Sequence, residues 1–135
     1  MKANKALSRL CKPAGFKPRN KNCWTNAINL LLEFGGKDLL YVEGFAVGEA
    51  GVPIEHGWIE CKGEVVEITP SWAKQEGVEY FAGVYYSYDE VIKNMSGKVP
   101  FVWQDGKYGM ETPAYINASR EAYKLIGIEQ KASQK

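Results

Sequence analysis

Histidine and cysteine, the usual ligands of zinc, are scarce in this chain. Its 135 residues include one histidine and three cysteines, and none of them forms a CxxC or HxxxH pair. The sequence therefore predicts no metal site. Glycine-rich phosphate loops of the GxxxxGK[ST] or GxGxxG type are also missing, so no cofactor is expected. Cysteines without paired spacing indicate free thiols in a reducing compartment, and we expect a cytoplasmic protein.

Long apolar runs are missing as well. The longest candidate, Ala27 to Leu32, is interrupted by Asn29, whereas a membrane-spanning helix needs about 20 apolar residues. The basic N-terminus has neither the apolar region nor the cleavage site of a secretory signal. We therefore expect no membrane partner. The length predicts a single domain over residues 1–135, with a polar, frayed tail at 129–135.

Acidic residues are absent from residues 1–22. Seven of the 17 Lys and Arg residues lie in this N-terminal segment, and all 16 Asp and Glu residues lie after it. Such a segment can contact nucleic acid or an acidic partner, be a solvated leader, or raise the electrostatic potential near Cys23. We do not expect nucleic acid as the partner, because Phe16 is the one aromatic residue among these basic residues on which a base could stack.

The remaining pattern predicts an α+β fold. Asn22 is a good N-cap for a helix that begins at Cys23, and apolar residues recur there at the spacing of a buried helical stripe. The sequence also predicts helices from Lys5 to Cys11, from the Ser87–Glu90 capping box to about Met95, and from Thr112–Pro113 to Ile126, with Gly35-Gly36 ending the Cys23 helix and Gly127 the last one. Strands are predicted at 39–47, 56–61, 64–69, 78–86 and 99–103, with turns at Lys62-Gly63 and Asp105-Gly106.

A thiol, an imidazole and a carboxylate follow one another along this pattern. Cys23 opens a helix, where the free N–H groups and the dipole favour a thiolate. If the hairpin turns at Lys62-Gly63, facing residues have numbers that sum to 125, which places His56 and Glu67 on one face of the sheet as diagonal neighbours about 7–8 Å apart. These are the parts of an activated cysteine nucleophile, with Cys23, His56 and Glu67 as the catalytic candidates.

Other residues compete for roles in this site. Glu60 and Asp89 are the alternative carboxylates, and Cys11 and Cys61 are predicted to be small buried hydrophobic residues. The backbone N–H of Cys23 is one candidate donor to an oxyanion. The side chains of Asn20 and Asn22 rank ahead of Asn26 as the second donor, since Asn26 lies within the helix and can instead support the site. Candidates to line a substrate groove are Trp24, Trp58 and Trp72, together with the loop at 48–53 and the aromatic run at 80–88.

Four short motifs resemble the transglutaminase-like branch of the papain-like superfamily. They are residues 22–27 (NCWTNA), 41–46 (YVEGFA), 56–60 (HGWIE) and 66–70 (VEITP), and the likeness covers about residues 20–72. The resemblance implies a papain-like fold with the nucleophile helix packed on an antiparallel sheet. It also implies Cys23 as nucleophile, His56 as base and Glu67 at the position where the family has Asp. The larger members' accessory domains have no counterpart here.

The residues and the resemblance together lead us to expect a cysteine-dependent hydrolase or acyltransferase. The predicted substrate is a protein, a peptide or a small amide, cleaved through a thioester. Hydrolysis is preferred over transfer because water needs no second binding site. Arylamine-type acyl transfer is a second enzymatic possibility, although no donor-binding motif supports it. The non-enzymatic alternative is a binding module that keeps this scaffold and engages a protein or nucleic-acid partner.

Overall fold

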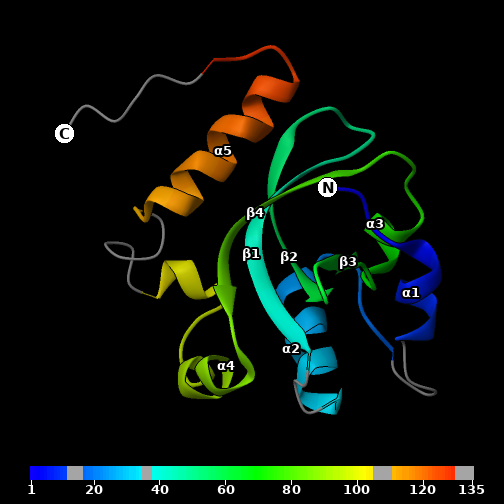
Figure 1. Cartoon of the computed structure of the whole chain (residues 1–135), viewed down its shortest axis with the longest axis vertical. Helices are drawn as coiled ribbons and strands as arrows, with labels where there is room; N and C mark the ends of the chain where they lie inside the picture. Colours follow the sequence, from blue (N-terminus) through cyan, green and yellow to red (C-terminus); the bar gives the residue numbers. More distant parts are fainter. Residues whose placement is uncertain (12–16, 35–37, 105–110, 130–135) are drawn as a thin grey trace.

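Four antiparallel strands form one sheet that carries the candidate site (Figure 1). The strands are β1 (Leu39–Val47), β2 (Pro53–Cys61), β3 (Glu64–Val66) and β4 (Glu79–Tyr86), in the order β3-β2-β1-β4. The computed structural model describes residues 1–11, 17–34, 38–104 and 111–129. With helices packed against this sheet, the expected α+β class is confirmed.

The β2–β3 hairpin has the predicted register. Ile59 faces Val66, and Cys61 faces Glu64, so the paired numbers sum to 125. Lys62 and Gly63 have φ angles of 52° and 81°. Positive φ at both positions belongs to a type I′ turn, whose twist matches that of the two strands. The turn therefore places the side chains of β2 and β3 on the expected faces.

One face of the sheet is covered by helices. These are α2 (Cys23–Phe34), α4 (Tyr88–Asn94), the 3-10 turn η1 (Phe101–Trp103) and α5 (Pro113–Leu125). Leu30 and Leu31 of α2 pack in one buried cluster with Tyr41 and Ile59 of the sheet. Farther along, Phe45, Val47 and Val102 form a second cluster with Tyr115, Ala118 and Ala122 of α5. This burial of apolar surface holds the N-terminus of α2 at the sheet.

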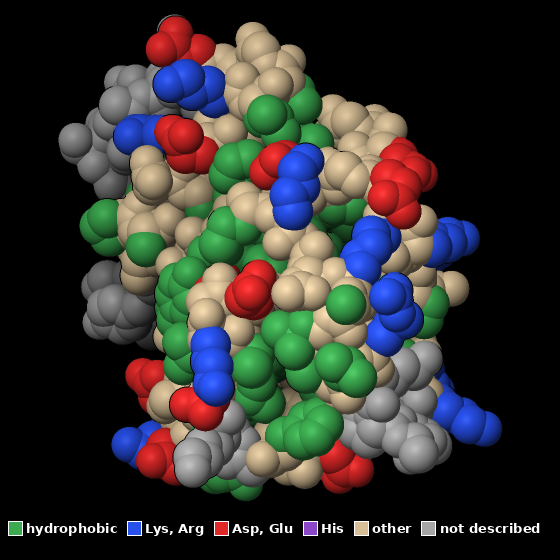
Figure 2. All heavy atoms as spheres, turned by 45° about the vertical axis from the view of Figure 1, so that its right-hand side comes forward, with side chains coloured by type: hydrophobic (Ala, Val, Ile, Leu, Met, Phe, Trp, Pro, Cys, Tyr) green, Lys and Arg blue, Asp and Glu red, His purple; other side chains and the backbone are tan. Residues whose placement is uncertain are grey.

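The opposite face is covered by the N-terminal segment, which includes α1 (Lys5–Leu10), and by α3 (Pro70–Ala73) (Figure 1). Ala3 forms a parallel bridge with Val65. Lys2 pairs with Glu79 at 2.8 Å, and Lys5 Nζ donates to the carbonyls of Ala73 and Gln75 at 2.7 Å. Residues 1–11 are thus a docked part of the domain. Figure 2 shows this side of the molecule, where basic and acidic side chains alternate and no histidine is visible.

Residues 99–103 do not form the predicted strand. Pro100 lacks an N–H for a ladder, and the next two N–H groups, of Phe101 and Val102, donate to the buried carboxylate of Glu43 at 2.5 and 2.8 Å. The chain therefore makes the turn η1 at Phe101–Trp103. Alternation of apolar residues does not reveal a side-chain acceptor 58 residues away.

The predicted strand at 64–69 is also too long. The ladder ends at Val66, and the Glu67 N–H donates instead to Ser8 Oγ at 2.9 Å. Thr69 then takes the N-cap position of α3, with Pro70 as its first residue. This helix was not predicted.

The other helix boundaries agree with prediction to within about one residue, including the Ser87–Glu90 capping box. The predicted stop at Gly35-Gly36, the turn at Asp105-Gly106 and the tail after residue 129 lie outside the described residues. Across the ranges that the structure describes, no helix has the length and apolar character needed to cross a membrane.

Candidate active site

His56 and Glu67 are in direct contact. Their Nε2 and Oε1 atoms are 2.5 Å apart, and the two side chains are 1% and 3% exposed. His56 comes from β2, and Glu67 is the first residue after β3. The contact follows from the hairpin register, which places both side chains on the face covered by the N-terminal segment and α3.

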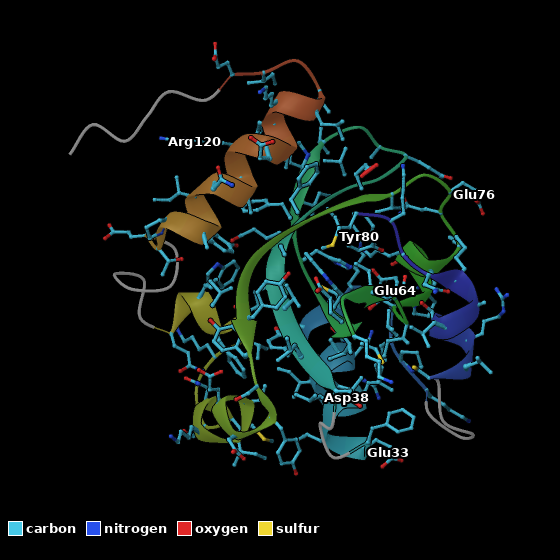
Figure 3. All side chains as sticks on the ribbon, in the orientation of Figure 1. Glu33, Asp38, Glu64, Glu76, Tyr80 and Arg120 are labelled. Atoms are coloured by element: carbon cyan, nitrogen blue, oxygen red, sulfur yellow. The ribbon has the colours of Figure 1, made fainter. Side chains whose placement is uncertain are left out.

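Two further donors hold the carboxylate of Glu67. The hydroxyl of Tyr80 donates to Oε1 at 2.7 Å, and the N–H of Thr69 donates to Oε2 at 3.1 Å. Tyr80 comes from β4 and lies on the side of the sheet that faces α1 and α3 (Figure 3). Sequence reasoning placed Tyr80 only within a groove-lining aromatic run. Tyr80 is two positions after the buried Val78, so the alternation of side chains along a strand indicated that Tyr80 points inward. Its contact with Glu67 could not be predicted without the order of the strands in the sheet.

Cys23 is the first residue of α2 and is 8% exposed. The carbonyl of Asn22 accepts the N–H of Asn26 at 2.8 Å, so Asn22 occupies the predicted N-cap position. The thiol of Cys23 lies close enough to the imidazole to contribute to the raised pKa of His56. The structure therefore brings together the three residues that the sequence singled out.

The imidazole lies in an environment that favours its charged form. Burial of the ring lowers the pKa of His56, but the charge of Glu67 opposes it. That charge, the nearby Cys23 thiol and the hydrogen bond to Glu67 raise the pKa of His56 from 6.5 to about 10. Nε2 is committed to Glu67, whereas Nδ1 has no well-aligned hydrogen bond within the described part of the chain. Nδ1 is therefore the nitrogen that remains to exchange a proton with the thiol.

Aromatic rings enclose His56. Trp72 is closest, with ring centroids 4.5 Å apart, and Trp58 stacks at 5.9 Å. The prediction that Trp58 lines a groove is wrong: it is 1% exposed, and its indole N–H donates to Glu60 at 3.3 Å. Trp72 is half-buried and lines a cavity of about 220 Å³ together with Glu67 and Tyr80.

Trp24 lies on the other side of the β2 backbone. A Cβ added at Gly57 would lie 2.4 Å from Trp24 Cδ1, so this position in β2 requires glycine. The half-buried ring of Trp24 also makes an edge contact with Trp103, at 5.6 Å between centroids. Trp103, which is 43% exposed, was not predicted as a site residue. Its placement depends on η1, which the sequence pattern did not reveal.

The three asparagines have different roles. Asn26 is buried, and its amide is fully used: Oδ1 accepts from Arg19 N–H, and Nδ2 donates to the Arg19 carbonyl at 2.6 Å and to Thr69 Oγ1 at 3.0 Å. Asn26 thus supports the site, which is the alternative that the sequence predicts for this residue. Asn20 and Asn22 are exposed, and Asn20 Oδ1 accepts from the N–H of Ser71 at 2.8 Å.

The competing carboxylates lie elsewhere. Glu60 accepts from Trp58 and from the Tyr85 hydroxyl, and burial raises the pKa of Glu60. Asp89 is exposed in the first turn of α4. Neither makes a hydrogen bond or ion pair with His56 in the ranges that the structure describes.

The cysteines differ from expectation in their burial. Cys11 and Cys61 are only partly buried, which corrects the prediction that they are core residues, whereas Cys23 is buried. Burial raises the pKa of the Cys11 thiol, and the neighbouring Cys61 adds to this rise. Among the described residues, no group of three or more His, Cys, Asp or Glu side chains is arranged to hold a metal ion.

Comparison of this chain with protein-family models, with curated proteins and with solved structures finds no match, so its function is argued from the geometry above.

Proposed function

We propose that the protein is a cysteine-dependent hydrolase or acyltransferase of the transglutaminase-like, papain-like type. Cys23 is the nucleophile, and His56 is the general acid and base. Glu67 orients His56 and stabilises the positive charge of its protonated ring. One observation carries this proposal: within the described residues, His56 Nδ1 is the sole buried side-chain nitrogen or oxygen without a hydrogen bond, and it belongs to the ring whose pKa the Cys23 thiol affects. Buried polar atoms are almost always paired, so an exception needs an explanation, and a catalytic role is one.

The chemistry starts from a thiolate–imidazolium pair. The thiol proton of Cys23 resides on Nδ1 of His56, and the negative charge of Glu67 stabilises the resulting cation. The sulfur attacks the substrate carbonyl, and the carbonyl oxygen becomes an oxyanion. The backbone N–H of Cys23, at the start of α2, is the first donor to that oxyanion, and the exposed side chains of Asn20 and Asn22 are candidates for the second.

The intermediate then collapses to a thioester. The carbon–nitrogen bond breaks, and Nδ1 of His56 gives its proton to the leaving amine. Neutral His56 next takes a proton from water as the water oxygen attacks the thioester. The acid leaves, and the thiolate–imidazolium pair is restored. An amine in place of water gives acyl transfer by the same steps.

A protein, a peptide or a small amide is the substrate class that this chemistry accepts. The free thiolate requires a reducing environment, and a cytoplasmic location satisfies that requirement. No cofactor enters the steps above.

The burial of the site favours one second candidate, a non-catalytic binding module on the same scaffold. Cys23 is the most exposed of the three residues, and only 8% of its surface is accessible. In a binding module the His56–Glu67 pair would be structural, and the half-buried Trp24 and Trp72 would contact a partner.

Profiling with electrophilic acyl and amide probes separates the two functions. The native protein is incubated with the probe library, and adducts are located by mass spectrometry of peptides. A hydrolase or acyltransferase forms acyl adducts at Cys23, and Cys23→Ala and His56→Ala variants do not accumulate them. A native protein in which Cys23 forms no adduct with any probe would refute the enzymatic proposal and leave the binding module.

A further inference from the structure

A half-buried carboxylate lies next to the proposed catalytic residues but has no role in their chemistry. Glu55 immediately precedes His56 in β2 and points to the opposite face of the sheet. Trp103 and Tyr115 donate to it, and Trp24 lies against Gly57, two positions farther along the same face of β2. We refer to Glu55, Trp24, Trp103 and Tyr115 as the Glu55 cluster.

One oxygen of this carboxylate is fixed and the other is open. Oε2 of Glu55 accepts from the hydroxyl of Tyr115 and from the indole N–H of Trp103 at 3.3 Å. These donors come from the first turn of α5 and from η1, and Val102 of η1 packs in one buried cluster with Tyr115. Oε1 accepts no hydrogen bond from the residues that the structure describes. The side chain is therefore held in one orientation, and Oε1 remains able to accept a hydrogen bond.

The Glu55 cluster is joined to the proposed catalytic pair through the backbone. Trp24 follows Cys23 in α2, and its ring lies against Gly57, the residue after His56. Trp103 contacts Trp24 edge-on at 5.6 Å. Cys23 and Trp24 are consecutive residues, whose Cα atoms are about 3.8 Å apart. Trp24, and Trp103 in contact with it, are therefore within reach of a substrate that extends from Cys23 around the β2 backbone. The 43% exposed ring of Trp103 is accessible from solvent.

Glu55 has a second carboxylate near it. Glu55 and the buried Glu43 lie on one face of the sheet, where burial raises the pKa of Glu43, hydrogen bonds to Glu43 oppose the rise, and the charge of Glu55 adds to it. Neither carboxylate forms an ion pair with Lys or Arg in the described ranges, where all the ion pairs lie at the N-terminal segment or in the His56–Glu67 contact. A cation that reaches Glu55 therefore does not have to displace a Lys or Arg of the described residues from an ion pair.

We propose that the Glu55 cluster binds a positively charged group of the substrate, an ammonium or a guanidinium, next to the bond that Cys23 attacks. The open oxygen of Glu55 accepts a hydrogen bond from the cation, and the indole faces of Trp24 and Trp103 stabilise it by cation–π interaction. This inference rests on the proposed function and adds the substrate class: amides or acyl compounds that carry a basic group.

Paired chloroacetamides test the inference. Each probe carries a terminal ammonium on an alkyl spacer of varied length, and its partner has the same amine acetylated and neutral. The sulfur of Cys23 displaces chloride, and mass spectrometry gives the rate of labelling. The cationic-to-neutral rate ratio is divided by the same ratio for free N-acetylcysteine. In the native protein we expect this normalised ratio to exceed one at the best spacer length.

Glu55→Gln should lower that ratio by about three- to tenfold, in line with the loss of one charged contact. Glu33→Gln is the matched control, because Glu33 is exposed at the far end of α2, and it should leave the ratio unchanged. Trp103→Leu gives a second variant at an exposed position and should also lower the ratio. If Glu55→Gln does not fold, the effect of Trp103→Leu on the ratio is the test of the inference.

The outcomes separate this inference from the proposal beneath it. Equal labelling by the cationic and neutral probes, or a ratio that neither variant changes, would overturn the Glu55 inference while Cys23 stays a nucleophile. If Cys23 reacts with neither probe in the native protein, the proposed function fails and the inference fails with it.

Discussion

At the scale of single residues, Glu67 performs three tasks with one carboxylate. It binds His56, accepts the Tyr80 hydroxyl and accepts the N–H of Thr69. These contacts fix both oxygens, so the additional methylene of Glu relative to Asp does not loosen the group. The ring nitrogen turned away from Glu67 is consequently left for Cys23.

Replacing Glu67 by Gln should reduce activity by up to about 10⁴-fold, because the imidazolium loses its counter-charge. The variant should keep its fold, since the amide oxygen can still accept from Tyr80 or Thr69. Turnover of an amide substrate identified by the probe library is the measurement. Glu60→Gln and Asp89→Asn are the control variants and should have mild effects. Near-normal turnover in Glu67→Gln would mean that Cys23 and His56 act as a dyad.

The raised pKa of His56 also predicts how stability changes with pH. A folded-state pKa of about 10 against 6.5 means that protonated His56 stabilises the fold fully below about pH 6.5. This contribution is lost as the pH rises from there to about 10, with a slope of at most about 1.4 kcal/mol per pH unit for one proton. Urea unfolding of Cys23→Ala at several pH values measures the slope, because a proton that His56 takes from the thiol does not change the number of protons bound by the protein. The slope should be smaller when Glu67→Gln is added to Cys23→Ala. Equal slopes in the two proteins would show that Glu67 does not raise the pKa.

The rate at which each cysteine is alkylated should depend on the activation of its thiol more than on its exposure to solvent. Limiting iodoacetamide at neutral pH should modify Cys23 ahead of Cys11 and Cys61, although those two are less buried. The cause is the position of Cys23 next to His56, which can take the thiol proton as the sulfur attacks. Peptide mass spectrometry at early times gives the order, and His56→Ala should slow labelling of Cys23 alone. Faster labelling of Cys61 than of Cys23 would contradict the assignment.

At the scale of elements, the sequence predicts what depends on local pattern. The start of α2 followed from the cap and the apolar stripe, and the contact of His56 with Glu67 followed from hairpin parity. The short β3, the helix α3 and the turn η1 were not predictable in this way. In each case a side chain distant in sequence, such as Ser8 or Glu43, satisfies a backbone N–H that would otherwise join a ladder. Tyr80 reaches Glu67 only through the strand order.

The position of α2 depends on Asn26. Its amide joins Arg19, before the helix, to Thr69, after β3. Asn26→Ala leaves buried partners unpaired and should lower the free energy of unfolding by about 1–3 kcal/mol. Asn29→Ala, at an exposed position of the same helix, is the control and should have little effect. Urea denaturation measures the free energy of unfolding of both variants. Equal losses in Asn26→Ala and Asn29→Ala would show that Asn26 does not position α2.

At the scale of the whole molecule, the N-terminal segment is part of the site's support. Ser8 of α1 accepts the N–H of Glu67, and Ala3 bridges to Val65. The basic residues Lys2 and Lys5 are used in contacts with the segment around α3 and β4. The segment therefore closes the face of the sheet on which His56 lies.

Ser8→Ala tests this closure. The substitution leaves the Glu67 N–H buried without an acceptor and should lower the free energy of unfolding by about 1–3 kcal/mol. Turnover should fall as well, since the Glu67 backbone is released. Ser96→Ala, the same change at an exposed position, is the control. Unchanged stability and turnover in Ser8→Ala would show that the N-terminal segment does not position the carboxylate.

This docking has a consequence for how the protein is made. The first residues leave the ribosome long before their partners, because Ser8 must wait for Glu67, which lies 59 positions later, and Ala3 for Val65. Contacts of such sequence separation form late and slow the folding of a small domain. A nascent chain that ends before Tyr80 lacks the hydroxyl that holds Glu67. The proposed nucleophile is therefore synthesised well before the contacts that complete its surroundings can form.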